Sequence, residues 1–324
     1  FFKQKTAYEI PKRDWSSDVC SSDLATPGKV LVPGKLLADI SRSLPNKPVT
    51  IQLDGTRVLV NAGSAKFTLP LLPLNEYPNL PDMPDALGSI DAETLSHAVA
   101  QVSTAAGKDD SLPSLTGVHI EVNGENITMA ATDRYRLAVR ELTFNPARPN
   151  TEAVALIRAR TLLDAAKTLA TSKNVNIALA PATSPDRLAG FQTDSKSTTT
   201  RLLDGTFPPY RHLLPQESLT TTVIEVTPFL DAVRRVALVT DKTIPLKLTF
   251  TGNTVTLEAG GGEEAQANEV FEIHKTGEDL SIAFNPNYLL DGLHAISAPY
   301  AQISFNTAGK AAILMGKKIG RAHV

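Results

Sequence analysis

The sequence predicts an α+β protein made of three tandem copies of one module, in which short amphipathic helices alternate with half-buried strands. Two observations predict this fold class: a helix-like segment recurs three times without gaps, and a strand-like segment led by glycine also recurs three times. The 324 residues give room for two or three domains. With 42% hydrophobic and 20% charged residues, the composition is that of a globular protein and argues against disordered or fibrous classes.

The first repeated element is a short helix. The segments "GKLLADISRSL" (34–44), "ARTLLDAAKTL" (159–169) and "PNYLLDGLHAI" (286–296) align without gaps, and each has an aspartate after an apolar pair. Two apolar columns lie seven residues apart, a spacing that puts both on one helix face. Each segment follows a short apolar run and precedes an alternating one, "VTIQL", "VNIAL" or "AQISF". Each helix is therefore expected between two strands.

The second repeated element is a turn and a strand. The segments "GTRVLVNA" (55–62), "GENITMAA" (124–131) and "GNTVTLEA" (252–259) share a glycine, alternating apolar positions and an alanine. This pattern predicts a turn glycine that leads into a half-buried strand.

Two further elements occur twice. "LSHAVAQVSTAAGK" (95–108) matches "FLDAVRRVALVTDK" (229–242), with apolar residues at helical spacing and a terminal lysine. "LPLNEYPNLP" (72–81) matches "LLDGTFPPYRHLLP" (202–215), which predicts a proline-rich connector after each of the first two modules.

These elements define the domains that we expect. Residues 25–85 hold the second half of domain I, residues 86–219 a complete domain II, and residues 220–316 a domain III without its last strands. The terminal segments 1–24 and 317–324 do not fit the repeat, and the first resembles translated sequencing-adapter sequence. We expect both to be non-native and the native protein to be longer at both ends.

Composition excludes several classes of site. The only cysteine and the only tryptophan, Cys20 and Trp15, lie in the segment that we regard as non-native, so disulfides, zinc–thiolate sites and cysteine nucleophiles are not expected. No apolar run reaches the roughly 18 residues of a membrane span, and the start lacks a signal peptide's apolar core. We therefore expect a cytoplasmic protein. No catalytic constellation stands out, and we expect no metal or cofactor.

The repeated helices carry a cationic column opposite their apolar stripe. Residues at spacings of four and three lie on one side of a helix. Starting from the second residue of each segment, this column is Lys35, Asp39 and Arg42 in the first copy, Arg160, Asp164 and Lys167 in the second, and Asn287, Asp291 and His294 in the third. With the cations of the 95–108 and 229–242 segments, the candidates for facing a polyanion are Lys35, Arg42, Lys108, Arg160, Lys167, Arg234, Arg235 and Lys242.

These columns allow two interpretations. They are either solvated helix surfaces that pair their own charges, or a shared surface that attracts phosphates without reading bases. A net charge of −2 excludes DNA binding by overall positive charge, but not by a local basic surface. The repeat alone is compatible with a solenoid, a pseudo-symmetric enzyme or a ring.

A family resemblance narrows these alternatives. "ATDRYRLAVREL" (131–142), "LVPGKLLADISRSLPNKPV", "STTTRLLDGTFPPYRHLLP", "IAFNPNYLLDGL" and "FNTAGKAAIL" resemble the bacterial DNA polymerase III beta subunit, the sliding clamp, of actinobacterial type, over about residues 25–316. The resemblance implies the DNA clamp fold, with inner helices and outer antiparallel sheets. It also implies a head-to-tail homodimeric ring around duplex DNA. Such a ring is not itself an enzyme but an accessory of the DNA-directed DNA polymerase, whose holoenzyme is a nucleotidyltransferase that acts in replication.

The same resemblance implies a pocket for short peptides of the polymerase III alpha subunit, the clamp loader, other polymerases and repair proteins. Apolar residues would form a recess for a leucine or phenylalanine, and Arg136 would fix polar atoms of the peptide. The alternative is a solvated strand edge whose charges discourage aggregation. The residues assigned to the pocket are Leu115, Thr132, Arg134, Tyr135, Arg136, Leu137, Pro208, His212, Leu213 and Ala311.

Two rival functions stay open from the sequence. One is a pseudo-threefold enzyme acting on a phosphorylated or nucleic-acid substrate, which would need perturbed acids or a metal in a cleft. The other is a clamp paralogue that confers drug resistance through an altered peptide pocket.

The segment 108–115 matches a DNA-facing loop of the family, but it carries the acidic residues Asp109 and Asp110, which oppose DNA contact at that loop.

Overall fold

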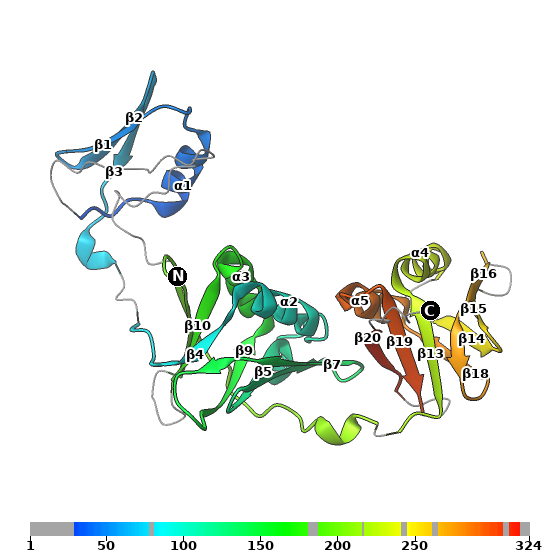
Figure 1. Cartoon of the computed structure of the whole chain (residues 1–324). Helices are drawn as coiled ribbons and strands as arrows, with labels where there is room; N and C mark the ends of the chain where they lie inside the picture. The colour runs from blue at the N-terminus through cyan, green and yellow to red at the C-terminus, as the bar shows by residue number, and fades with distance from the viewer. Residues whose placement is uncertain are drawn as a thin grey trace, which may run out of the picture. The chain divides into compact units, whose positions relative to one another are not determined.

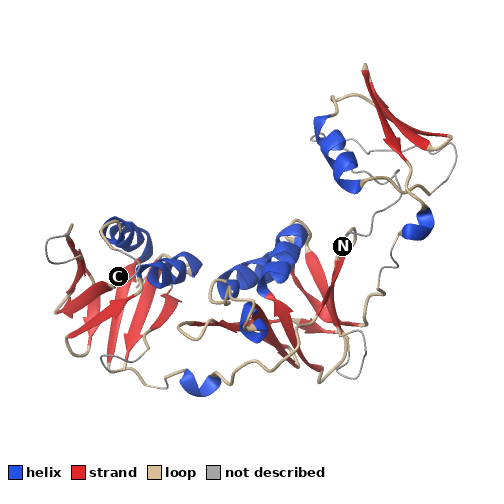
Figure 2. Cartoon of the chain, turned by 180° about the vertical axis from the view of Figure 1, so that it is seen from behind, coloured by secondary structure: helices blue, strands red, loops and turns tan. Residues whose placement is uncertain are grey.

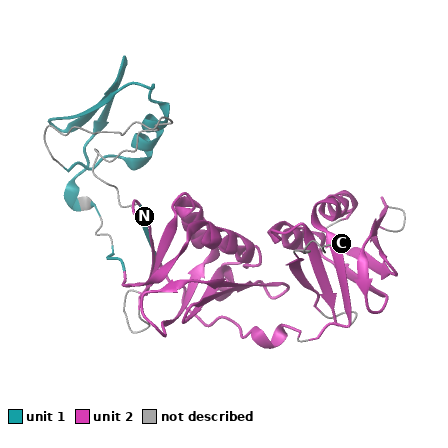
Figure 3. Ribbon diagram, in the orientation of Figure 1, with its two compact units in different colours: residues 1–83, 196–199 teal, residues 84–195, 200–324 magenta. Residues whose placement is uncertain are grey.

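A computed structural model describes residues 29–77, 81–180, 187–215, 217–240, 245–260, 265–306 and 311–317. The chain divides into two compact units, residues 1–83 with 196–199, and residues 84–195 with 200–324 (Figure 3). The segment 1–24, with Trp15 and Cys20, lies outside the described residues, and so do residues 318–324.

The described part of the first unit holds an α-helix and a small sheet. Helix α1 (Gly34–Ser43) precedes the antiparallel strands β1 (Val49–Asp54), β2 (Arg57–Ala62) and β3 (Ala65–Pro70), which pair in that order, and a short 3-10 turn η2 (Leu74–Glu76) follows. Apolar residues of the helix and the sheet form its core, namely Val32, Ile40, Val58, Val60 and Leu69.

The second unit begins with two sheets around a helix pair. One sheet has the order β12-β11-β10-β4-β8 and the other the order β7-β6-β5-β9. The helices are α2 (Ala92–Ser103) and α3 (Ala159–Leu169), and a 3-10 turn η3 (Pro113–Thr116) precedes β5. The strands are β4 (Ala86–Asp91), β5 (Gly117–Asn123), β6 (Asn126–Thr132), β7 (Leu137–Thr143), β8 (Asn145–Pro146), β9 (Glu152–Arg158), β10 (Asn174–Leu179), β11 (Leu188–Gln192) and β12 (Ser197–Arg201).

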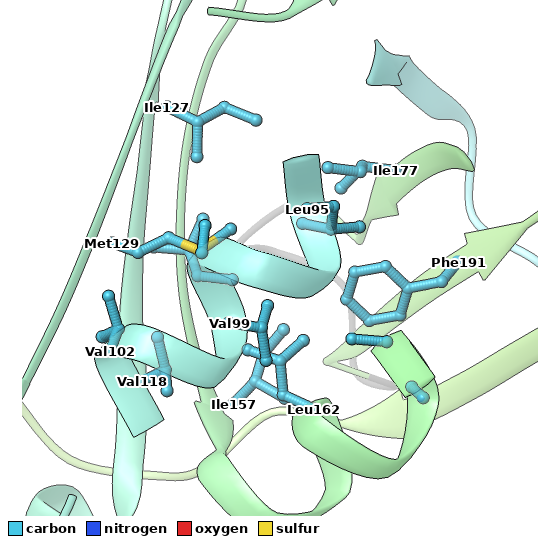
Figure 4. Close-up of a cluster of buried hydrophobic side chains, with 14 of the residues drawn as sticks. Leu95, Val99, Val102, Val118, Ile127, Met129, Ile157, Leu162, Ile177 and Phe191 are labelled. Carbon is cyan, nitrogen blue, oxygen red and sulfur yellow. The ribbon is translucent and has the colours of Figure 1, made fainter. Parts of the chain in front are cut away.

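A single apolar core joins this helix pair to both sheets. Figure 4 shows Leu95 and Val99 of α2 and Leu162 of α3 beside Met129 of β6 and Phe191 of β11. All five side chains are essentially inaccessible to solvent. Burial of the apolar stripes is therefore what fixes α2 and α3 against the sheets.

The same arrangement recurs after a connector that contains the 3-10 turn η4 (Arg211–Leu213). Its sheets have the orders β17-β13-β19-β20 and β16-β15-β14-β18. The helices are α4 (Val226–Ala237) and α5 (Pro286–Ala295). The strands are β13 (Thr220–Glu225), β14 (Leu246–Thr251), β15 (Thr254–Ala259), β16 (Ala267–Glu272), β17 (His274–Thr276), β18 (Leu280–Phe284), β19 (Tyr300–Phe305) and β20 (Ile313–Lys317).

The repeated segments fold alike, as the sequence predicts. Helices α1, α3 and α5 begin at the same repeat position, at Gly34, Ala159 and Pro286. Within the second unit, α2 lies beside α3 and α4 beside α5, and both pairs lie on the side away from the connector (Figures 1 and 2). The antiparallel sheets lie around the helices. This is the α+β architecture of inner helices and outer sheets.

The second pair of repeated helices differs from the sequence prediction at both ends. Helices α2 and α4 start three residues earlier than the 95–108 and 229–242 segments, directly after β4 and β13. In α2 the carboxylate of Asp91 accepts the backbone N–H of Thr94 at 2.8 Å and fixes this start. The helix then ends before Lys108, because the N–H of Gly107 donates to the carbonyl of Leu115 at 2.8 Å instead of continuing the helix.

In the part of the chain that the structure describes, no helix is long and apolar enough to cross a membrane.

Candidate binding site

The turn at residues 132–137, between β6 and β7, is held by its own side chains. The hydroxyl of Thr132 donates to the carbonyl of Arg136 at 2.7 Å and accepts the N–H of Arg134 at 3.1 Å. The carboxylate of Asp133 accepts the N–H groups of Tyr135 and Arg136, both at 3.0 Å. These bonds hold the loop between Thr132 and Leu137, the last residues that β6 and β7 pair.

Two residues of this turn face solvent. Arg134 has a φ of 80°, in the left-handed region that a residue with a Cβ seldom occupies. The side-chain bonds of the turn impose that conformation. Tyr135, the next residue, is 76% exposed, a large value for an aromatic side chain. Both are therefore available to a ligand.

A cavity of about 330 Å³ lies beside the 132–137 turn. Its wall combines the turn, the chain that follows α2, η3 and one tyrosine of α5. The lining residues are Ala106, Gly107, Lys108, Asp109, Leu112, Leu115, Asp133, Arg134, Tyr135, Arg136 and Tyr288. Apolar and aromatic side chains next to charged ones suit a ligand with an apolar anchor and polar flanks.

Arg136, one of the charged residues of this wall, is bonded to two carboxylates. Its Nε donates to Asp133 at 2.9 Å and its Nη1 donates to Asp291 of α5 at 2.6 Å. The guanidinium carbon lies 4.5 Å from the centre of the Tyr288 ring. Burial opposes the charged form, but the hydrogen bonds to Asp291 and then Asp133 outweigh it and raise the pKa of Arg136. Arg136 is therefore a fixed cation.

A second part of the candidate site is the connector, residues 202–215, which packs on β5, β6 and β9. Phe207 and Tyr210 are buried with Ala130 and Leu156, and Leu137 packs against this cluster. The Phe207 ring stacks on His119, with the ring centres 5.0 Å apart and an interplanar angle of 4°.

Charged groups complete the attachment of the connector. His119 Nε2 lies 3.0 Å from Glu121 Oε1, and Arg211 donates to the other oxygen of Glu121. The hydrogen bond with His119 is the largest cause that lowers the pKa of Glu121; burial opposes it, and Arg211 adds to it. The anchored connector presents Leu213, which is 59% exposed, on the outer surface.

The predicted pocket residues have different positions. Leu115, Arg134, Tyr135 and Arg136 line the cavity, whereas Thr132 holds the turn. Leu137 is partly buried against the apolar cluster of the connector, and Pro208, His212 and Leu213 are exposed on the connector. Ala311 is exposed just before β20 and is not among the described residues that line the cavity.

Sequence reasoning did not assign Tyr288 or Asp291 to this site. It put Asp291 in the outward column of the third helix, but the side chain bonds to Arg136. One signal existed in the sequence: α5 has no lysine or arginine, so its aspartate lacks a partner on its own helix.

The predicted DNA-facing cations fall into two groups. Arg42, Arg234 and Arg235 each bond to an acid, at Asp39, Asp231 and Glu269. Among the described residues, the other cations of the prediction have no hydrogen-bond or ion-pair partner; they are Lys35, Lys108, Arg160 and Lys167. Lys242 lies outside the described residues.

One of the two acids of the 108–115 loop is paired with a cation, and the other is bonded to the backbone. Asp110 accepts a hydrogen bond from Arg158 at 2.6 Å, and Asp109 accepts the N–H of Ser111 at 2.9 Å. The predicted repulsion between this loop and an anion is therefore weaker than the sequence suggests.

Family models match the three modules separately. The N-terminal, central and C-terminal domains of the DNA polymerase III beta subunit match residues 5–81, 89–209 and 211–322. The beta sliding clamp of Streptomyces coelicolor is 50% identical, over 91% of this chain and 79% of its own length. The beta sliding clamp homolog GriR of Streptomyces muensis is 41% identical, over 90% of this chain and 77% of its own.

Solved structures agree with the described fold. The Pseudomonas aeruginosa sliding clamp bound to griselimycin has a TM-score of 0.84 at 28% identity, and covers 92% of this chain and 80% of its own. The Bacillus subtilis sliding clamp has a TM-score of 0.81 at 25% identity, and the match covers 90% of this chain and 77% of the Bacillus chain. The fold is thus that of a DNA clamp, a class of accessory proteins without a catalytic role of their own. The chain belongs to the DNA polymerase III beta subunit family, the bacterial beta sliding clamps.

Proposed function

We propose that the protein is a cytoplasmic, homodimeric sliding clamp that encircles duplex DNA and tethers polymerase and repair proteins. The observation that carries this proposal is the threefold repeat, in which the same helix recurs in every module and carries exposed cations in the first two. On α3 the outward column supplies Arg160 and Lys167, exposed and without an acidic partner among the described residues. Such cations attract the phosphates of DNA whatever its base sequence, and a protein that slides along DNA requires this kind of attraction.

Topological binding makes a specific prediction. The clamp, loaded onto a nicked circular plasmid by its clamp loader, should remain bound through gel filtration and leave when the plasmid is cut once. A closed ring has no end to slide from, whereas linear DNA has two. Retention is measured by following labelled clamp in the DNA fractions before and after cutting. Equal retention on circular and linear DNA would contradict encirclement.

We also propose that the 132–137 turn and the connector together bind short partner peptides. Candidate partners are the polymerase III alpha subunit, the clamp loader, other polymerases and repair proteins. Leu137 and the exposed Pro208 and Leu213 offer an apolar surface, and the neighbouring cavity offers Tyr135 and fixed charges. An apolar anchor with a few oriented polar groups is the usual composition of a binding hot spot.

Leu213 gives a clean test of this peptide site, because its exposure allows substitution without disturbing a core. Leu213→Glu should weaken binding of a fluorescein-labelled peptide from the clamp-binding segment of the alpha subunit by at least tenfold in fluorescence anisotropy. Val154→Glu, at a residue 67% exposed on β9, is the matched control and should leave the affinity unchanged. If the two variants bind the peptide with equal affinity, the connector is not part of the peptide site.

A second candidate function is a clamp paralogue with an altered, drug-resistant peptide pocket; the 41% identity to a protein named a beta sliding clamp homolog keeps the paralogue in consideration. The 50% identity to the Streptomyces coelicolor clamp favours the replicative role. Griselimycin binding, compared with that of a replicative clamp by calorimetry, distinguishes the two, since a paralogue with an altered pocket should bind it much more weakly.

A further inference from the structure

The aspartate of the repeated helix has a partner on its own helix in the first copy. Asp39 accepts a hydrogen bond from Nη1 of Arg42 at 3.0 Å, and both side chains are more than half exposed. In the second copy, Asp164 also has a cation, Lys167, three residues later. At this spacing, the two charges lie on the same helix face.

The third copy departs from this pattern. Three residues after Asp291 stands His294, whose Nε2 lies 2.5 Å from Arg234 Nη2 and whose Nδ1 lies 2.7 Å from the carbonyl of Leu290. The carboxylate of Asp291 instead reaches the preceding module and accepts a hydrogen bond from Arg136 Nη1 at 2.6 Å. The residues are 155 positions apart in sequence.

Arg136 transmits this contact to the whole 132–137 turn. Its side chain is only 17% exposed and lies between the carboxylates of Asp133 and Asp291. Its backbone carbonyl accepts from Thr132, and its N–H donates to Asp133. A change in the position of the guanidinium would therefore disturb the bonds that define the turn.

We propose that Asp291 is a positioning residue of the peptide site, which acts through Arg136 and does not itself contact the peptide. The inference rests on the proposed peptide-binding role of the 132–137 turn. Asp291 is not among the described residues that line the cavity, whereas Arg136 and Tyr288, one turn earlier on α5, are. Helix α5 of the third module thus fixes a binding surface that belongs mostly to the second.

A second contact keeps α5 in place for this role. Nε2 of Gln101 in α2 donates to the carbonyl of Ala295, at the end of α5, at 2.6 Å and lies 3.4 Å from the hydroxyl of Ser297. The helix is therefore attached to the preceding module at its middle, through Asp291, and at its C-terminal end, through Ala295. By linkage, a peptide that requires the observed turn also favours this attachment.

The test uses the full chain and the labelled alpha-subunit peptide in fluorescence anisotropy. Asp291→Asn should weaken peptide binding about five- to tenfold, because the amide of asparagine can accept only a weaker, neutral hydrogen bond from Arg136 and leaves the guanidinium without its ion pair to α5. Asp164→Asn is the matched control, since it removes the same charge at the same repeat position of α3, and it should change the affinity less than twofold. Asp291→Glu, which keeps the carboxylate, should stay within about threefold of the unsubstituted protein.

A double-mutant cycle separates positioning from a general structural effect. If Asp291 acts through Arg136, Asp291→Asn should have little further effect in a protein that already carries Arg136→Ala. Equal affinities of Asp291→Asn and Asp164→Asn would overturn the inference. So would a loss that is the same with and without Arg136. Failure of the unsubstituted protein to bind the peptide would instead overturn the proposed peptide site on which the inference rests.

Discussion

The glycines that open three repeated hairpins are required by backbone conformation and not by space. Gly55, Gly124 and Gly252 have φ values of 57°, 57° and 54°, and a Cβ built on any of them would meet nothing within 4 Å. Only the left-handed conformation therefore disfavours other residues. Arg134 occupies the same region of φ without being glycine, and the bonds of the 132–137 turn offset its strain.

Substitution of Gly124 measures this conformational cost directly. Gly124→Ala should lower the free energy of unfolding by about 1 kcal/mol, because alanine is strained at positive φ. Gly124→Asn is the matched control and should cost less, since asparagine tolerates this region. Urea denaturation followed by circular dichroism gives both values. If alanine and asparagine cost the same, the backbone explanation of the repeated glycine is wrong.

At the scale of elements, the sequence predicts helices and strands well because each buries one face. The apolar columns of α1, α3 and α5 and the alternation in β2, β6 and β15 are local patterns with a period of 3.6 or 2. The start of α2 was less predictable. The start is set by the Asp91 cap and by the end of β4, and neither can be predicted from the apolar stripe of the helix.

The candidate site was less predictable than the elements, because its decisive contacts join distant segments. The family resemblance assigned Arg136 to the pocket, but not its bond to Asp291. The outward column correctly placed Asp291 on a helix surface, yet a helical period does not say what that surface meets. The stacking of His119 on Phe207 is equally invisible to local pattern. Such contacts need the fold before they can be read.

At the scale of the whole molecule, the third module has an apolar surface suited to a second copy of the chain. Leu238, at the end of α4, is 84% exposed, and Val270 on β16 is 61% exposed. Strand β16 is an edge of its four-stranded sheet, so one side of its backbone lacks a strand partner within the described residues. An open edge with apolar side chains favours association by strand or side-chain contacts. The proposed homodimer would cover this surface.

Leu238→Glu tests whether this surface closes the ring. If the second copy covers Leu238, a carboxylate there would be buried without a partner, and the dimer dissociation constant should rise at least tenfold in sedimentation velocity. The same variant should lose its retention on circular DNA but keep its affinity for the alpha-subunit peptide, because the peptide site lies on other elements. Val154→Glu introduces the same charge on β9 and should dimerise normally. A Leu238→Glu protein that dimerises as tightly as Val154→Glu would exclude the end of α4 from the interface and leave the ring to be closed by another surface.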